Sequence, residues 1–147
     1  MYKRILVPTD GSPLSKKAVK NAVELAAGMG AELVALNVVS RYPVSYFEGG
    51  ASISPQEIGR IEKQWAEKGQ ALADGAAQAA ERAGVKAKGV IMRSDLVAEA
   101  ILAAVRKNKC DLVVMASHGR KGIKRLLLGS ETQHVLTHGD IPVLVLR

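Results

Sequence analysis

The sequence is poor in the residues that cross-link small proteins or anchor them in membranes. Its 147 residues include one cysteine, which excludes an internal disulfide and a zinc framework. No apolar stretch approaches the roughly 18 residues that a membrane span needs. The short apolar run that ends at Pro8 is not expected to act as a signal peptide. We therefore expect a cytoplasmic, soluble protein.

Aromatic side chains are also scarce. They make up 3% of the residues, whereas hydrophobic residues make up 48%, so Ala, Val, Leu and Ile must build the core. This composition favours a parallel sheet covered by helices over an aromatic-rich β-sandwich. The length fits one domain, residues 1–147. Cys110, just before the run DLVVMA, is interpreted as a small buried hydrophobic residue rather than a nucleophile.

The positive charge of the chain does not by itself identify a partner. The formal net charge is +7, but no nucleic-acid-binding module is recognisable and few aromatic rings are available to stack on bases. A basic cleft for an anionic small molecule fits the charge equally well. Nucleic-acid binding stays a weaker third alternative.

Apolar runs of the strand type alternate with helical patterns along the chain. The runs cover residues 3–8, 31–39, 86–92, 110–117 and 141–146. Between the second and third runs, Ser54, Pro55 and Glu57 form a capping-box start for a long helix. The alternation predicts an α/β fold, a doubly wound parallel sheet of five strands with helices on both faces. The common strand order for such a sheet is 3-2-1-4-5.

The last strand, Ile141 to Leu146, is predicted to lie at an edge of the sheet. Pro142 cannot donate to a strand ladder, yet the run is apolar on both faces. An exposed edge of this kind favours pairing, so we expect a homodimer through this strand. The alternative is an edge covered by the helices of the same chain.

Two strand ends carry small and polar residues, PTDGS at 8–12 and ASHG at 116–119. In strand order 3-2-1-4-5 both ends meet at the point where ligands bind in such sheets. Gly119 and Gly122 allow close backbone approach, and Ser130 followed by Gln133 resembles a capping box that starts a fourth helix. Approachable amides, a helix N-terminus and nearby cations suit a polyphosphate. The alternative is a solvated basic loop.

The sequence resembles a single-domain member of the universal stress protein family. The resemblance rests on ILVPTDGS, on IPVLVLR and on the glycine segment between them. The nucleotide-binding branch has a motif of Gly, two residues, Gly, nine residues, then Gly with Ser or Thr. Gly119, Gly129 and Ser130 match it, and Ala116 replaces the first glycine. The resemblance implies a Rossmann-like fold of the adenine-nucleotide alpha-hydrolase type.

The resemblance also implies an ATP or AMP ligand, with Mg²⁺ accompanying the phosphates, and homodimerisation through the fifth strand. Pro8, Thr9 and Asp10 would line the adenosine side, and Val38 would contact adenine through its backbone. Gly119, Gly129 and Ser130 would hold phosphates through amides and a hydroxyl. The rest of the candidate nucleotide-binding set is Ala116, His118, Arg120, Gly122 and Glu131.

Other polar residues have simpler interpretations. Asp10 is either a ligand contact or an Asx-type cap of the turn. His118 has no accompanying Ser-His-Asp arrangement, so no catalytic residue is predicted and any ATP hydrolysis is expected to be slow. His134 and His138 have a spacing compatible with a metal, but no third ligand is evident, and no metal site is predicted.

The resulting hypothesis is a dimeric stress-response sensor or regulator that binds an adenine nucleotide. The alternative is a nucleotide-free interaction module of the same fold, which would engage a partner protein through its dimer surface or the loop at residues 40–53.

Overall fold

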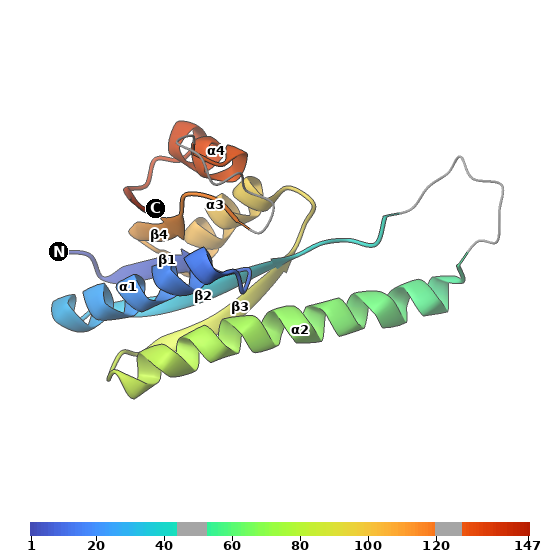
Figure 1. Ribbon diagram of the computed structural model, residues 1–147, viewed down its shortest axis with the longest axis horizontal. Coiled ribbons are helices and arrows are strands. Elements are labelled where there is room, and N and C mark those ends of the chain that lie inside the picture. Colours follow the sequence, from blue (N-terminus) through green and yellow to red (C-terminus); the bar gives the residue numbers. More distant parts are fainter. Residues whose placement is uncertain (44–52, 120–127) are drawn as a thin grey trace.

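The computed structural model describes residues 1–43, 53–119 and 128–147. Strands and helices alternate through these residues (Figure 1), and the strand bounds lie within two residues of the predicted ones. The elements are β1 (Arg4–Pro8), α1 (Pro13–Met29), β2 (Glu32–Val39), α2 (Pro55–Arg82), β3 (Ala87–Arg93), α3 (Val97–Asn108), β4 (Leu112–Ala116), α4 (Ser130–His138) and β5 (Val143–Leu146).

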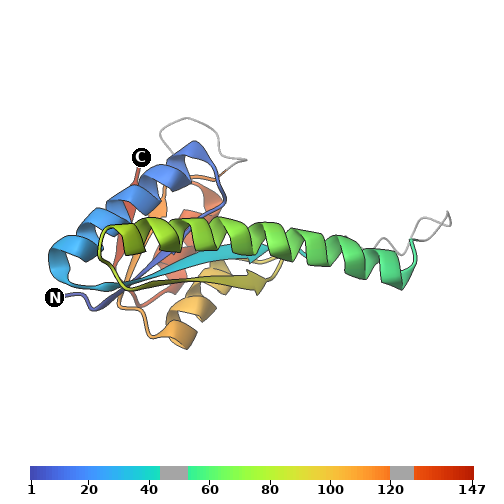
Figure 2. The same cartoon turned by 90° about the horizontal axis from the view of Figure 1, so that it is seen from below.

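The five strands form one parallel sheet in the order β3-β2-β1-β4-β5. This confirms the predicted topology, and the order reverses between β1 and β4. Helices α1 and α2 cover one face of the sheet and α3 and α4 the other (Figures 1 and 2). In β1, Ile5 and Val7 pack on the α1 and α2 side, whereas Leu6 packs on the opposite side. Both faces are therefore buried, as in other parallel sheets.

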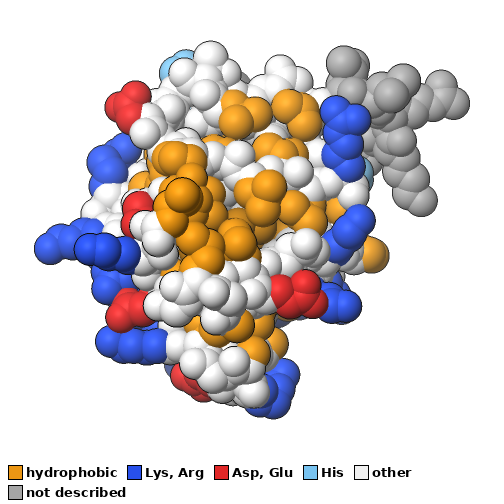
Figure 3. Space-filling model, turned by 90° about the vertical axis from the view of Figure 1, so that its left-hand side faces the viewer, with side chains coloured by type: hydrophobic (Ala, Val, Ile, Leu, Met, Phe, Trp, Pro, Cys, Tyr) orange, Lys and Arg blue, Asp and Glu red, His pale blue; other side chains and the backbone are white. Residues whose placement is uncertain are grey.

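Strand β5 lies at an edge of the sheet, as predicted from Pro142, which directly precedes the strand. Its Leu144 is 43% exposed, and Leu136 on α4 is exposed to the same extent. Figure 3 shows hydrophobic side chains gathered on the left-hand side of the molecule as drawn in Figure 1, with charged side chains around them. The edge strand therefore presents apolar surface to solvent.

Side-chain caps fix where the first two helices begin. The Ser12 hydroxyl accepts the Ser15 N–H of α1 at 3.2 Å, and the Ser54 hydroxyl accepts the Glu57 N–H of α2 at 3.2 Å. The second contact confirms Ser54 as the predicted N-cap. Because only residues 9–11 separate Ser12 from the end of β1, its cap also holds the turn after β1 close to the start of α1.

Helix α2 has 28 residues and extends well beyond the sheet (Figures 1 and 2). Its buried residues all lie in its second half and are Gly69, Ala73, Ala76, Ala77 and Ala80. In its exposed first half, Trp65 stacks on Tyr42 with ring centroids 6.0 Å apart. Among the described residues, no helix is both long and apolar enough to cross a membrane.

Cys110 is partly buried and packs against the core on the α3 side. Burial raises the pKa of its thiol to about 11, so the side chain stays protonated at neutral pH. Because the thiolate is the reactive form of cysteine, the structure agrees with a packing role for Cys110.

Asp111 ties the start of β1 to the start of β4. Its carboxylate accepts the backbone N–H groups of Lys3 and Arg4, each at 2.9 Å. Burial alone would raise the pKa of this carboxyl, but the hydrogen bonds from Arg4 and Lys3 outweigh it and hold the pKa below its ordinary value.

Asp111 is therefore expected to contribute to acid unfolding. A carboxyl whose pKa is lowered by folding stabilises the protein above its unfolded pKa, near 4, and this stability is lost as the pH falls through the folded pKa. Urea unfolding of the native protein and of Asp111→Asn at pH 7 and pH 3 measures this contribution. We expect the variant to lose less stability between the two pH values, and equal losses would contradict the assignment.

Candidate functional site

The chain makes a tight turn immediately after β1. The Asp10 carboxylate accepts the Ser12 N–H at 2.9 Å, and Gly11 adopts a positive φ of 78°. The Thr9 hydroxyl lies 3.3 Å from the Ser15 hydroxyl at the start of α1. Asp10 thus forms the Asx turn that was one of its two interpretations, and this turn follows directly on the end of β1.

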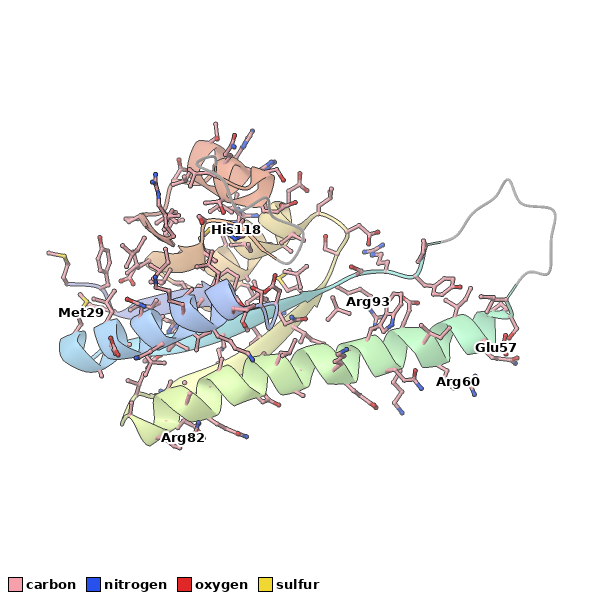
Figure 4. The ribbon with its side chains drawn as sticks, in the orientation of Figure 1. Met29, Glu57, Arg60, Arg82, Arg93 and His118 are labelled. Atoms are coloured by element: carbon pink, nitrogen blue, oxygen red, sulfur yellow. The ribbon has the colours of Figure 1, made fainter. Side chains whose placement is uncertain are left out.

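The end of β4 meets the turn after β1, as the strand order requires. A Cβ atom on Gly119 would lie 2.8 Å from the Asp10 Oδ2, so a side chain there would displace the carboxylate. His118 precedes Gly119 at this end of β4 (Figure 4), and its Nδ1 lies 3.2 Å from the Ser117 hydroxyl. The structure therefore brings Asp10 and Gly119 together, as predicted.

Helix α4 begins at Ser130, as predicted, but the predicted cap is wrong. The N-cap is Gly129, no side chain caps the helix, and the Gln133 side chain donates to the Leu128 carbonyl at 2.6 Å. The first backbone bond of the helix runs from the Gln133 N–H to the Gly129 carbonyl. The N–H groups of Ser130, Glu131 and Thr132 therefore precede the helical ladder. Such free amides, together with the helix dipole, are suited to binding an anion.

Gly129 acts differently from the prediction. Its N–H donates to the Ser117 carbonyl at 2.7 Å, so this amide is already engaged within the protein. A Cβ at this position would lie 3.0 Å from the Ser117 oxygen and 3.2 Å from the His118 Cα. Gly129 thus supplies close backbone approach between β4 and α4, and the amides available to an anion come from the residues after it.

Thr132 holds α4 against β4, a role that the sequence analysis missed. It is 2% exposed, and its hydroxyl lies 3.0 Å from the Ala116 carbonyl and 3.2 Å from the Ser117 carbonyl. The available signal was a threonine in the first turn of a helix that follows a strand end. Its bonds place the start of α4 beside the end of β4.

Ala116 is the last residue of β4. Among the non-glycine residues that the structure describes, only Lys109 has a positive φ. Ala116 therefore has an ordinary backbone conformation, and alanine causes no backbone strain there. The only remaining effect of Ala116 is the volume of its methyl group.

Asn37 holds β2 to the turn after β1 and was also missed. It is 8% exposed, and its side-chain amide donates to the Thr9 carbonyl at 2.8 Å, while the Thr9 N–H donates to the Leu36 carbonyl at 2.8 Å. A polar residue within the apolar run LVALNVV was the signal. The next residue, Val38, is partly buried against the core on the α3 side. Since it adjoins Asn37 near the end of β2, its backbone lies at the same end of the sheet.

The Glu131 side chain bonds to helix α3 instead of being free for a ligand. Its carboxylate accepts the Ala98 N–H in the first turn of α3 at 2.9 Å, where the N-cap Leu96 provides no side-chain cap. Because the carboxylate is engaged in this way, only the backbone N–H of Glu131 is available for the predicted contact with a nucleotide. Arg120 and Gly122, and residues 44–52 of the loop at 40–53, lie outside the described residues.

Comparison with known proteins agrees with this architecture. The universal stress protein family profile matches residues 1–147. A universal stress protein of Methanocaldococcus jannaschii is 36% identical over 147 residues, which is 100% of this chain and 83% of the relative. The chain belongs to the universal stress protein family.

Solved structures of universal stress proteins share the fold of this family member. Another protein of M. jannaschii is 26% identical with a TM-score of 0.83, and the match covers 99% of this chain and 96% of the other. A universal stress protein solved in complex with cAMP is 25% identical with a TM-score of 0.69, over 99% of this chain and 97% of the other. The Rossmann-like α/β fold is therefore established.

Proposed function

We propose that this universal stress protein binds an adenine nucleotide, ATP or AMP, between the ends of β1 and β4 and acts as a stress-response sensor or regulator. The observation that carries the proposal is the start of α4, whose amides at Ser130 and Glu131 lie beyond the end of β4. Phosphate groups bind at such helix N-termini. The relative solved with cAMP supports an adenine nucleotide as the ligand.

The residues at the two strand ends and at the start of α4 would each contact one part of the nucleotide. The amides and hydroxyl of the first α4 turn, together with Gly119, would hold phosphates. Pro8, Thr9 and Asp10 would line the adenosine, and the Val38 backbone would contact adenine. No group of three or more metal-ligating side chains occurs in the described part of the chain, so Mg²⁺ would be held by phosphate oxygens and water, as this ion prefers.

The proposed sensor role requires binding and release rather than turnover. The His118 ring contacts the neighbouring Ser117 hydroxyl, and we assign no residue as a general base. Fast phosphoryl transfer depends on a positioned general base. Any ATP hydrolysis by this protein is therefore expected to be slow.

Native purification tests whether the protein carries a nucleotide. The protein is purified without added nucleotide, denatured, and its released small molecules are identified by mass spectrometry. We expect ATP or AMP in the released fraction. A protein that is empty and also fails to take up ATP or AMP with Mg²⁺ would favour the nucleotide-free interaction module.

The exposed edge of β5 supports a homodimer as part of this proposal. Pairing of β5 with a second copy would cover Leu144, which is 43% exposed, and would complete the ladder of the edge strand. Light scattering at micromolar concentration is expected to give the mass of a dimer for the native protein and for Leu136→Lys, which changes an equally exposed residue on α4. Leu144→Lys is expected to give a monomer. A native monomer would contradict the pairing.

Replacing Ala116 with glycine is expected to have a mild effect. Alanine causes no backbone strain at this position, so only its methyl group can act on a ligand. We expect the Kd for ATP to change by less than about 3-fold, which corresponds to roughly 0.6 kcal/mol. Isothermal titration of both proteins measures the change. Tightening by a further order of magnitude would mean that the methyl group narrows the site.

A further inference from the structure

Helix α4 presents two histidine rings side by side. His134 and His138 are one helical turn apart, and their ring centroids are 4.1 Å apart with an angle of 25° between the ring planes. His138 is exposed and His134 is partly exposed. Residues four positions apart lie on the same face of a helix. The helix therefore brings two imidazoles within reach of a single ion.

A backbone hydrogen bond orients one of these rings. The His138 Nδ1 lies 3.2 Å from the His134 carbonyl oxygen. Because a carbonyl only accepts, Nδ1 carries the proton in this contact, and a neutral imidazole then has its lone pair on Nε2. Histidines that bind metals commonly donate their other ring N–H to a backbone carbonyl in this way. His138 is thus arranged to offer Nε2 as a ligand.

We propose that His134 and His138 bind a divalent late first-row transition metal ion, of the class of Cu²⁺, Ni²⁺ and Zn²⁺. Imidazole suits these ions, and Cu²⁺ binds most strongly in the series. Ligand nitrogens lie about 2.0–2.1 Å from Zn²⁺, so two of them on one ion come within roughly 3 Å of each other. The rings would have to rotate from the observed stack to bring one nitrogen of each to that separation.

The proposed site has two protein ligands and is open to water. No group of three or more metal-ligating side chains is found within residues 1–43, 53–119 and 128–147, so water would complete the coordination of the ion. We therefore expect binding in the micromolar range rather than the tight binding of a structural metal centre. Since chelation requires both rings on one face, bound metal would also stabilise the helical form of α4.

This metal site is independent of the proposed nucleotide function. The histidines are the middle and last residues of α4, whereas the proposed anion site uses the first turn. Their chemistry also differs, because Mg²⁺ prefers oxygen ligands and imidazole prefers the later transition metals. Metal binding tested without nucleotide therefore succeeds or fails separately from nucleotide binding.

Titration of the full chain with Cu²⁺, without nucleotide, tests the proposal by calorimetry and visible absorption. We expect one ion per chain with the absorption of imidazole-bound Cu²⁺, and a higher thermal midpoint in its presence. His134→Asn and His138→Asn should each weaken binding at least 10-fold. His118→Asn, which changes a histidine outside α4, should leave it unchanged.

A variant in which two neighbouring side chains of α4 are exchanged provides the most direct control. Gln133→His combined with His134→Gln keeps the composition but moves one imidazole around the helix, so that the two rings no longer share a face. We expect this variant to bind as weakly as the single variants. Native affinity in the exchanged variant, or in either single variant, would overturn the proposal.

Discussion

Replacing Gly129 with aspartate is expected to weaken binding of ATP and AMP by roughly 100-fold or more while α4 stays folded. Gly129 is the N-cap of α4, with φ −59° and ψ 152°, a conformation that any residue adopts. Aspartate is a preferred N-cap and bonds to N–H groups two or three residues further along. Its carboxylate would thus occupy the amides proposed for phosphate and repel the phosphate charge, at a cost of several kcal/mol.

The matched variant Gly129→Asn separates charge from shape. Asparagine has nearly the same size and also caps helices, but it carries no charge. Either side chain must fit beside the Ser117 oxygen and the His118 Cα, 3.0 and 3.2 Å from the added Cβ. We expect the asparagine variant to bind ATP more weakly than the native protein but more tightly than the aspartate variant.

Adenosine distinguishes loss of the phosphate contact from loss of the whole site. It lacks the phosphate that the α4 amides would hold, so calorimetric titration should give similar adenosine affinities for the native protein and the aspartate variant. Circular dichroism checks that both are folded. Native ATP affinity in Gly129→Asp would show that phosphate does not bind at the start of α4.

The second large effect is expected at Gly89 in β3, where α2 lies against the sheet. A Cβ on Gly89 would lie 2.7 Å from the Ala73 carbonyl carbon, 2.7 Å from the Asp74 nitrogen and 2.6 Å from the Asp74 Oδ1. Two of these atoms belong to the α2 backbone, so the whole helix would have to move. Overpacking of this kind costs about 3 kcal/mol, which lowers the thermal midpoint by roughly 6–12 °C in a chain of this size.

Two glycines on α2 itself provide controls, because their replacement by alanine should raise the thermal midpoint instead of lowering it. Gly59 and Gly75 have no atom within 4 Å of an added Cβ, and alanine is favoured over glycine within a helix by about 0.5–1 kcal/mol. Gly59→Ala and Gly75→Ala should therefore raise the thermal midpoint slightly. Calorimetric unfolding of the three variants measures the difference, and an unchanged midpoint for Gly89→Ala would contradict the close packing of α2 on β3.

The packing of α2 also bears on the proposed site. A Cβ on Gly69 of α2 would lie 2.5 Å from the Asn37 Oδ1, and the Asn37 amide holds the Thr9 carbonyl at the end of β1. A displaced α2 would therefore act on the turn after β1 through Asn37. For this reason Gly89→Ala should also weaken nucleotide binding in the fraction of protein that stays folded.

Local patterns were sufficient to predict the fold. Apolar strand runs, the Ser54 N-cap and the edge proline each depend on neighbouring residues, and the structure confirms the elements, the cap and the strand order. The approach of the two strand ends also followed, because the carboxyl ends of adjacent parallel strands lie at one edge of a sheet. The contact between Gly119 and Asp10 confirms it.

Partners from distant parts of the chain could not be predicted in the same way. The Glu131 carboxylate caps α3, and the Gly129 N–H bonds to the Ser117 carbonyl. Neither contact has a local pattern, because each depends on how α4 lies against β4 and α3. Ser130 was mistaken for the cap because its spacing to Gln133 fits a capping box, whereas the contact that places α4 comes from Thr132. For the same reason, Gly129 was predicted to bind phosphate through its amide, whereas in the structure it allows the backbones of β4 and α4 to approach closely.

Isothermal titration of the native protein with ATP and with AMP, in the presence of Mg²⁺, tests the proposed function most directly. The account predicts saturable binding of one nucleotide per chain, tighter than binding of adenosine under the same conditions because the start of α4 would hold phosphate. The absence of binding for both nucleotides up to millimolar concentration would contradict it.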